Sequence, residues 1–257
     1  MKKTALLTLA LLAIPALALA QTAGPLNINV GNDLLNPRHM FQIIALITVL
    51  SVAPSLLLMV TSFTRLIIVF SFLRSAMGLQ SSPPNAVLVA LSLFLTSFIM
   101  MPTFQAAWNQ GLNPYLNNQI DEQQAFHRTV QPFERFMVAN VRENDLDLFL
   151  NFLPKDEQKN VVLPGPDVKP DQIAIPLQAL IPAFLISELR RAFEIGFLIF
   201  IPFLVIDLAV ASILMSIGMM MLPPVTVALP FKIIFFVLVD GWHLLTATLI
   251  QSFHPPL

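Results

Sequence analysis

From residue 177 to the end of this 257-residue chain, seven charged residues stand in or beside the long apolar runs, and their chemistry matters first. They are Glu188, Arg190, Arg191, Glu194, Asp207, Lys232 and Asp240. An ionisable side chain in a membrane segment is costly, and it usually faces a partner or an aqueous cavity. These residues could therefore form ion pairs that fix helix register, or a relay for protons or ions.

The spacing of the charges favours ion pairs. Glu188 and Arg191 are three residues apart, and so are Arg191 and Glu194. Arg190 and Glu194 are four apart, so every one of these pairs can form along a single helix. We expect Glu188 to pair with Arg191 or with a cation of a neighbouring subunit, and thereby to stabilise assembly.

Asp207 and Lys232 lie in successive apolar runs, and we expect them to pair between helices. The acidic residues do not form a regularly spaced chain, which favours a structural role for these charges. A relay stays open as the alternative.

Familiar reactive motifs are missing. The four histidines form no His-x-x-x-His pair, and there is no Gly-rich phosphate loop and no Gly-x-Ser-x-Gly elbow. The sequence has no cysteine, so it offers no disulfide and no thiolate metal site. We therefore expect a protein that is not an enzyme and that has no metal site and no cofactor.

Composition defines the class of protein. Hydrophobic residues make up 56% of the chain and charged residues only 11%, whereas about a quarter of a soluble domain is charged. The sequence therefore predicts an integral membrane protein. The net charge of -1 argues against a nucleic-acid partner.

The first residues are typical of a cleavable signal peptide. Lys2 and Lys3 precede a short apolar stretch, and Ala18-Leu19-Ala20 fits the small-x-small cleavage rule. An uncleaved first span is the alternative. Cleavage would place the mature N-terminus on the periplasmic side of a bacterial membrane.

We predict that the precursor is cut between Ala20 and Gln21, because signal peptidase requires small residues at such a site. N-terminal sequencing of the purified protein measures this directly. A protein that starts at Met1 would contradict the prediction.

Four apolar runs follow, and we expect them to form two helical hairpins. The runs span residues 43–77, 86–108, 195–222 and 225–252, and Pro54 should kink the first, which is too long for one straight span. The expected parts are a signal peptide (1–20), an N-terminal periplasmic segment (21–41), a first hairpin (42–108), a polar helical region with a Pro-rich linker (109–176) and a second hairpin (177–257).

Each hairpin turns at a corner of similar design. The stretches "GLQSSPPN" and "GMMMLPPV" both read Gly, four residues, then Pro-Pro. Glycine suits the end of a helix, and proline suits the first turn of the next one. The corner residues are Gly78, Pro83 and Pro84 in the first hairpin and Gly218, Pro223 and Pro224 in the second. The signal peptide and the positive-inside rule both place these corners in the cytoplasm.

The polar region contains most of the charges, and residues 120–152 have an amphipathic helical pattern. The apolar stripe is expected at Phe126, Val130, Phe133, Met137 and Val141. This region is either a soluble helical loop or an interface between subunits. The fold class predicted is all-α, with a multi-pass membrane topology.

Three long stretches resemble a known family. They are "SLLLMVTSFTRLIIVFSFLRSAMGLQSSPPNAVLVALSLFLTSFIM" (55–100), "PAFLISELRRAFEIGFLIFIPFLVIDLAVASILMSIGMMMLPP" (182–224) and "ALPFKIIFFVLVDGW" (228–242). They resemble the FliP family, the P subunits of the flagellar type III export gate, to which injectisome R subunits are related.

The resemblance implies an assembly and a set of site residues. Five P subunits would join Q and R subunits in a conical gate without catalytic activity, with their helices partly raised out of the bilayer. The family's methionine-rich loop corresponds to Met219, Met220 and Met221, its Ser-Glu-Leu segment to Ser187, Glu188 and Leu189, and its buried acid to Asp207. The methionines would then seal a pore. A role in filling a packing gap is the alternative.

We therefore expect a core subunit of the flagellar protein export gate in the inner membrane, at the flagellar basal body. Its partners would be other copies of itself, Q and R subunits, other export-apparatus and basal-body proteins, exported unfolded flagellar proteins and membrane lipid. A secondary transporter of a small solute, with Asp207 and Lys232 as coupling residues, is the alternative.

Overall fold

The structure, a computed structural model, describes residues 58–158, 161–163, 174–219 and 222–253, with a few further residues between 40 and 55. The chain divides into two units, Met1–Ala53 and Pro54–Leu257. The predicted cleavage site at Ala20 and Gln21 and the predicted kink at Pro54 lie outside the described residues. All that follows concerns the second unit.

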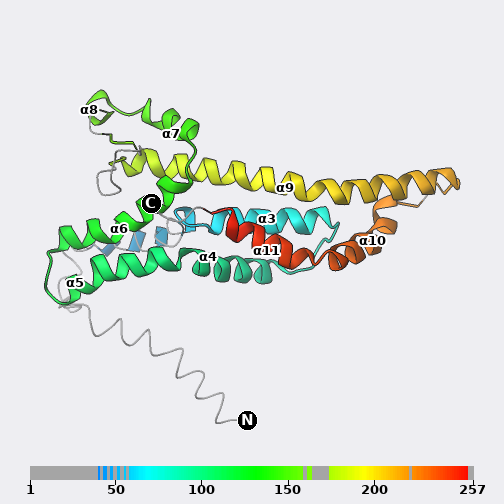
Figure 1. Cartoon of the computed structure of the whole chain (residues 1–257), viewed down its shortest axis with the longest axis horizontal. Helices are drawn as coiled ribbons and strands as arrows, with labels where there is room; N and C mark the ends of the chain where they lie inside the picture. The colour runs from blue at the N-terminus through cyan, green and yellow to red at the C-terminus, as the bar shows by residue number, and fades with distance from the viewer. Residues whose placement is uncertain are drawn as a thin grey trace, which may run out of the picture. The chain divides into compact units, whose positions relative to one another are not determined.

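The described part of this unit is built from helices, which confirms the predicted fold class (Figure 1). In chain order they are α3 (Phe63–Ala76), α4 (Asn85–Ala107), the π-helical turn η2 (Trp108–Leu112), α5 (Asn113–Leu116), α6 (Glu122–Asn140), α7 (Glu143–Leu150), α8 (Lys155–Gln158), α9 (Leu177–Ser216), α10 (Pro224–Leu238) and α11 (Gly241–Gln251). The described residues hold no strand beyond a single antiparallel bridge between Val162 and Ala174.

Two continuous helices are long and apolar enough to cross a membrane. One runs from Asn85 to Leu116 through α4, η2 and α5, and the other is α9 with 40 residues. A third span exists if α10 and α11, which meet at a bend of 63°, count as one. In the first predicted run the structure describes α3, whose 14 residues are fewer than the roughly 20 that a span needs.

The fourth apolar run, which the sequence predicted to form part of the second hairpin, is therefore divided into α10 and α11. Val239 and Asp240 separate the two helices, and Asp240 adopts a left-handed conformation (φ 51°) directly before α11 begins. A β-carbon on Gly241 would lie 2.1 Å from the Phe236 ring, so glycine is needed where the two helices meet. The bend follows from local geometry that apolar periodicity does not reveal.

Both predicted corners are present. Gly78 and Gly218 have φ of 76° and 81°, a region that favours glycine. The first corner is braced, because Arg74 donates hydrogen bonds to the Pro83 carbonyl and to Asn85 Oδ1. Around Gly218, by contrast, no described atom would lie within 4 Å of an added β-carbon.

Helix α3 packs along α9 and forms the centre of the unit (Figure 1). Leu66, Val69, Phe70 and Leu73 recur at helical spacing on its buried face. Lipid is as apolar as leucine, so close packing rather than water exclusion holds such helices together in a bilayer. Gly196 of α9 provides that closeness, since a β-carbon there would lie 2.5 Å from the Phe72 ring.

The buried face of the amphipathic helix α6 matches the predicted stripe only in part: Met137 is buried, and Phe133 and Val141 pack against the core. Phe126 of the expected stripe is exposed, whereas Ala125, Pro132, Phe136 and Asn140 are buried. The buried face therefore extends beyond the predicted stripe, because α6 packs on α4, on η2 and on α9. At η2, a β-carbon on Gly111 would lie 2.7 Å from the Thr129 backbone nitrogen.

The stability lost on replacing Gly111 or Gly196 with alanine should respond differently to a second substitution in the residue that each one contacts. Gly111→Ala pushes against the Thr129 backbone and should cost about 1–3 kcal/mol, which Thr129→Ala does not restore. Gly196→Ala pushes only against the Phe72 ring, so Phe72→Leu should restore much of the loss. Thermal unfolding in detergent measures all four variants. Rescue of Gly111→Ala by Thr129→Ala would show that the helices do not cross there as described.

Glu134 of α6 gives a pH-dependent contribution to stability. Burial raises the pKa of its carboxyl group above 4.5, and the nearby His127 opposes that rise. A raised pKa means that folding penalises the charged form, so stability is lost as the pH rises from the unfolded-state pKa through the folded-state pKa. Glu134→Gln should therefore raise the unfolding temperature at pH 7.5 and change it little at pH 4. A gain that is larger at pH 4 would contradict this.

Candidate functional site: buried ion pairs and exposed corner

The partner of Glu188 is Arg65, which the sequence analysis did not select. Arg65 Nε donates to Glu188 Oε2 at 2.7 Å, and Arg65 Nη2 donates to Oε1. Both side chains are 0% exposed. The prediction of Arg191 or a neighbouring subunit as partner is wrong, because both carboxylate oxygens bind a guanidinium 123 residues away. The signal that could have found it is the isolated charge of Arg65 within an apolar run.

Arg65 also holds the end of α11. Its Nη1 donates to the Ser252 carbonyl at 3.0 Å and to Ser252 Oγ at 2.8 Å. The guanidinium carbon lies 3.7 Å from the centre of the Phe253 ring. The last carbonyls of a helix have no partner within it and carry partial negative charge, so a buried cation is well suited to this position.

Asp207 and Lys232 form the pair that the sequence predicted. Lys232 Nζ donates to Asp207 Oδ2 at 2.7 Å and to the Ala76 carbonyl at the end of α3 at 3.1 Å. Lys232 is 3% exposed. Arg65 and Lys232 thus follow one design: each buried cation binds a carboxylate of α9 and caps the C-terminus of a third helix.

Ser187, next to Glu188, fastens α9 to the polar region. Its hydroxyl lies 2.8 Å from Asp145 Oδ2 and from the Ala183 carbonyl, and it accepts the Arg142 N–H at 3.1 Å. Successive residues of a helix point about 100° apart. Ser187 therefore contacts α7 while Glu188 contacts α3.

The remaining predicted charges lie at the surface. Arg190 and Glu194 pair at 3.0 Å with both side chains more than half exposed, and such pairs contribute little to stability. Glu194 thus pairs with Arg190, one of the two partners expected for it. Asp240 is exposed and lies at the bend before α11.

The second corner presents half-exposed apolar side chains. Met219 is about half exposed, and Leu222 and Val225 are similarly exposed. Met220 and Met221 lie outside the described residues. Among the described residues, no group of three His, Asp or Glu could hold a metal ion.

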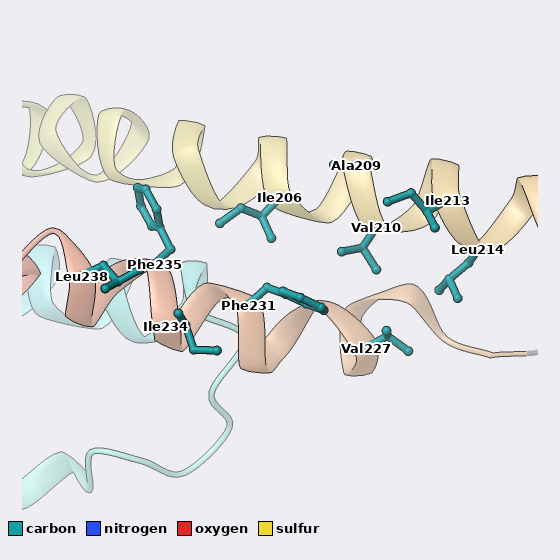
Figure 2. Close-up of a pocket in the computed structure, with 10 residues that line it drawn as sticks. All are labelled: Ile206, Ala209, Val210, Ile213, Leu214, Val227, Phe231, Ile234, Phe235 and Leu238. Atoms are coloured by element: carbon teal, nitrogen blue, oxygen red, sulfur yellow. The ribbon is translucent and has the colours of Figure 1, made fainter.

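A groove of about 530 Å³ separates α9 from α10 just before this corner (Figure 2). Ten aliphatic or phenylalanine side chains line it: Ile206, Ala209, Val210, Ile213, Leu214, Val227, Phe231, Ile234, Phe235 and Leu238. The groove offers no acid, base or nucleophile to a reaction. Its chemistry suits packing rather than catalysis.

Comparison with known proteins decides the family. Residues 46–249 match the FliP family, which is most of the chain. The chain belongs to this family. It is 49% identical to the flagellar biosynthetic protein FliP of Rhizobium meliloti over 98% of this chain and 100% of that protein. It is 48% identical to FliP of Bacillus subtilis over 89% of this chain and 98% of that protein.

Membership in the FliP family makes the chain a component of the flagellar export apparatus, and its long apolar helices make it a membrane protein. The matched region includes both corners and all four residues of the ion pairs Arg65–Glu188 and Asp207–Lys232.

Proposed function

We propose that the chain is a pore-forming core subunit of the flagellar protein export gate in the inner membrane. In this proposal several copies, five by resemblance, surround an axis together with Q and R subunits. Their second corners would point toward the axis and line the passage for unfolded flagellar proteins. The chain would conduct protein rather than catalyse a reaction.

The observation that carries the proposal is the contrast between the two corners. The first corner is tied down by Arg74 and lies against Lys232, whose Nζ would be 3.9 Å from a β-carbon on Gly78. The second corner has the same Gly and Pro-Pro framework but exposes Met219 to its surroundings. A half-exposed, uncharged apolar tip at the end of a 40-residue helix suits a contact with something outside the chain.

The contacts of Lys232 explain how such a tip can be held in place. Lys232 ties α10 to α9 and to the end of α3, so the shafts of the second hairpin are fixed at that level. The apolar groove extends along α10 on both sides of Lys232, and its part near the corner leaves α9 and α10 without tight packing there. The tip can then adjust its shape while its base stays in position.

Exposed apolar residues on α9 provide a surface for other subunits. Phe193, Phe197, Ile201, Leu204 and Leu208 follow one another at intervals of three or four residues. Their stripe runs along much of the helix. Neighbouring copies or Q and R subunits would cover it in the assembled gate.

The mass of the complex tests this function. Native mass spectrometry of the protein extracted with mild detergent should show a large hetero-oligomer with several copies of the chain and other flagellar proteins. A monomer or homodimer that carries no other flagellar protein would contradict the proposal.

A secondary transporter is the second candidate, and one observation favours it. Asp207 Oδ1 is buried and has no hydrogen-bond partner in the described part of the chain, as a site for a coupling ion would require. A transporter would extract as a monomer or dimer, so the same mass measurement separates the two functions.

A further inference from the structure

Three parts of the fold meet at the two residues that follow α11. Ser252 binds Arg65 of α3, which in turn binds Glu188 of α9. Phe253 lies between the Arg65 guanidinium and the Phe136 ring of α6, with the two ring centres 6.1 Å apart and nearly parallel. Ser252 and Phe253 thus connect the membrane-level helices to the polar region.

We propose that Ser252–Phe253 is a strap that couples the polar region to the helical hairpins, and that the chain assembles only when this strap is docked. The claim that assembly requires the docked strap rests on the proposed gate function. The claim that the strap couples the polar region to the hairpins concerns this chain alone and can be tested without the other gate subunits.

The contacts of the strap are directional, which distinguishes it from general apolar packing. The Ser252 carbonyl lies at the end of α11 and accepts from a fully buried Arg65. Undocking would leave that Nη1 group without its two acceptors in the interior, and hydrogen bonds to charged groups are among the costlier ones to lose. The docked position is therefore strongly preferred over partial release.

Release of the strap should act on α6 in particular. Phe136 contacts Phe253 on one side and Phe184 of α9 on another, and Met137 beside it is 1% exposed. Helix α7 keeps its own link to α9 through Ser187 and Asp145. Loss of the strap should therefore loosen α6 while α7 stays attached.

The test uses two shortened chains that differ by two residues. One ends at Phe253 and keeps the strap, and the other ends at Gln251 and lacks it. The sequence has no cysteine, so Met137→Cys places a single thiol at a buried position of α6, next to Phe136, whose ring stacks on Phe253. Leu148→Cys on α7, which is about half exposed, is the control for reagent access.

Labelling of purified protein with a polar maleimide measures docking. In the Met137→Cys background, the chain that ends at Phe253 should label as slowly as the full chain, and the chain that ends at Gln251 should label at least about tenfold faster. The control thiol on α7 should label equally in all three. Equal slow labelling of both shortened chains would overturn the strap.

Full-length point variants cover the case in which the shorter chain fails to fold. Phe253→Leu keeps an apolar side chain but loses the ring contacts, and combined with Met137→Cys it should speed the labelling of that thiol. Phe253→Tyr keeps the ring and should label like the parent chain. Equal labelling of the two variants would overturn the role of the ring.

Assembly is read from the native mass of the same samples. The chain that ends at Phe253 should form the same complex as the full chain, and the chain that ends at Gln251 should not. Fast labelling with a normal complex would overturn the assembly clause. If the full chain itself forms no complex with other flagellar proteins, the gate function fails, while the labelling result still decides the strap.

Discussion

Replacing Glu188 with leucine should lower the free energy of unfolding by about 3–5 kcal/mol, because Arg65 is left as an uncompensated charge in the interior. Arg65→Leu should cost at least as much, since it also removes the donor to Ser252. Thermal unfolding in detergent and the amount of folded protein in membranes measure both losses.

The double substitution is the informative control. When both partners of a buried ion pair become apolar, no unpaired charge remains, and stability is often restored. Arg65→Leu with Glu188→Leu should therefore be more stable than Glu188→Leu alone. Arg190→Ala breaks an exposed pair on the same helix and should cost no more than about 1 kcal/mol. If Glu188→Leu costs as little as Arg190→Ala, the buried pair does not stabilise the fold.

Because Arg65 belongs to the same chain as Glu188, its location decides whether the loss of stability appears in the single subunit or only in the complex. A partner in a neighbouring subunit would make Glu188 matter for the complex more than for the single chain. Because Arg65 lies in the same chain, the loss should already be visible in the isolated subunit. Complex yield should then fall in proportion to the amount of folded subunit.

The sequence predicted those features that depend on local pattern or on composition. Helix content, the two corners and the family follow from apolar runs, from Gly and Pro-Pro spacing and from long motifs. The pairing of Asp207 with Lys232 was also within reach, because they are the opposite charges on either side of one corner.

Features that depend on distant contacts were not predictable in the same way. Nothing in a single sequence shows that Arg65 reaches Glu188, since the pairing follows from how α3 lies on α9. The bend at Asp240 depends on one residue with positive φ, and the apolar pattern continues across it. The buried face of α6 depends on its contacts with α4, η2 and α9 together, and apolar periodicity alone cannot predict these contacts.

The largest functional effect is expected at the second corner. Met219, Met220 and Met221 changed together to alanine should leave the complex intact but leaky to ions at rest. Met219 is the described member of this group, and its exposure shows that the fold of the single chain does not need it as a core residue. Subunit stability should therefore change little, while a ring of such side chains would lose most of its bulk. Ion conductance of cells or bilayers that carry the complex measures the leak.

Changing the same three methionines to leucine distinguishes their role in excluding ions from their role in adapting to a passing chain. A ring of apolar side chains excludes ions by dewetting, so the triple leucine variant should stay sealed at rest. In the proposed pore, passage of an unfolded chain would make a second demand, because the ring would have to fit around side chains of every size. Methionine is unbranched and rotates about three bonds, whereas branched leucine adapts less well, so export by the leucine variant should be slower. If the alanine complex assembles normally and stays sealed, the three methionines are not the seal of the proposed pore.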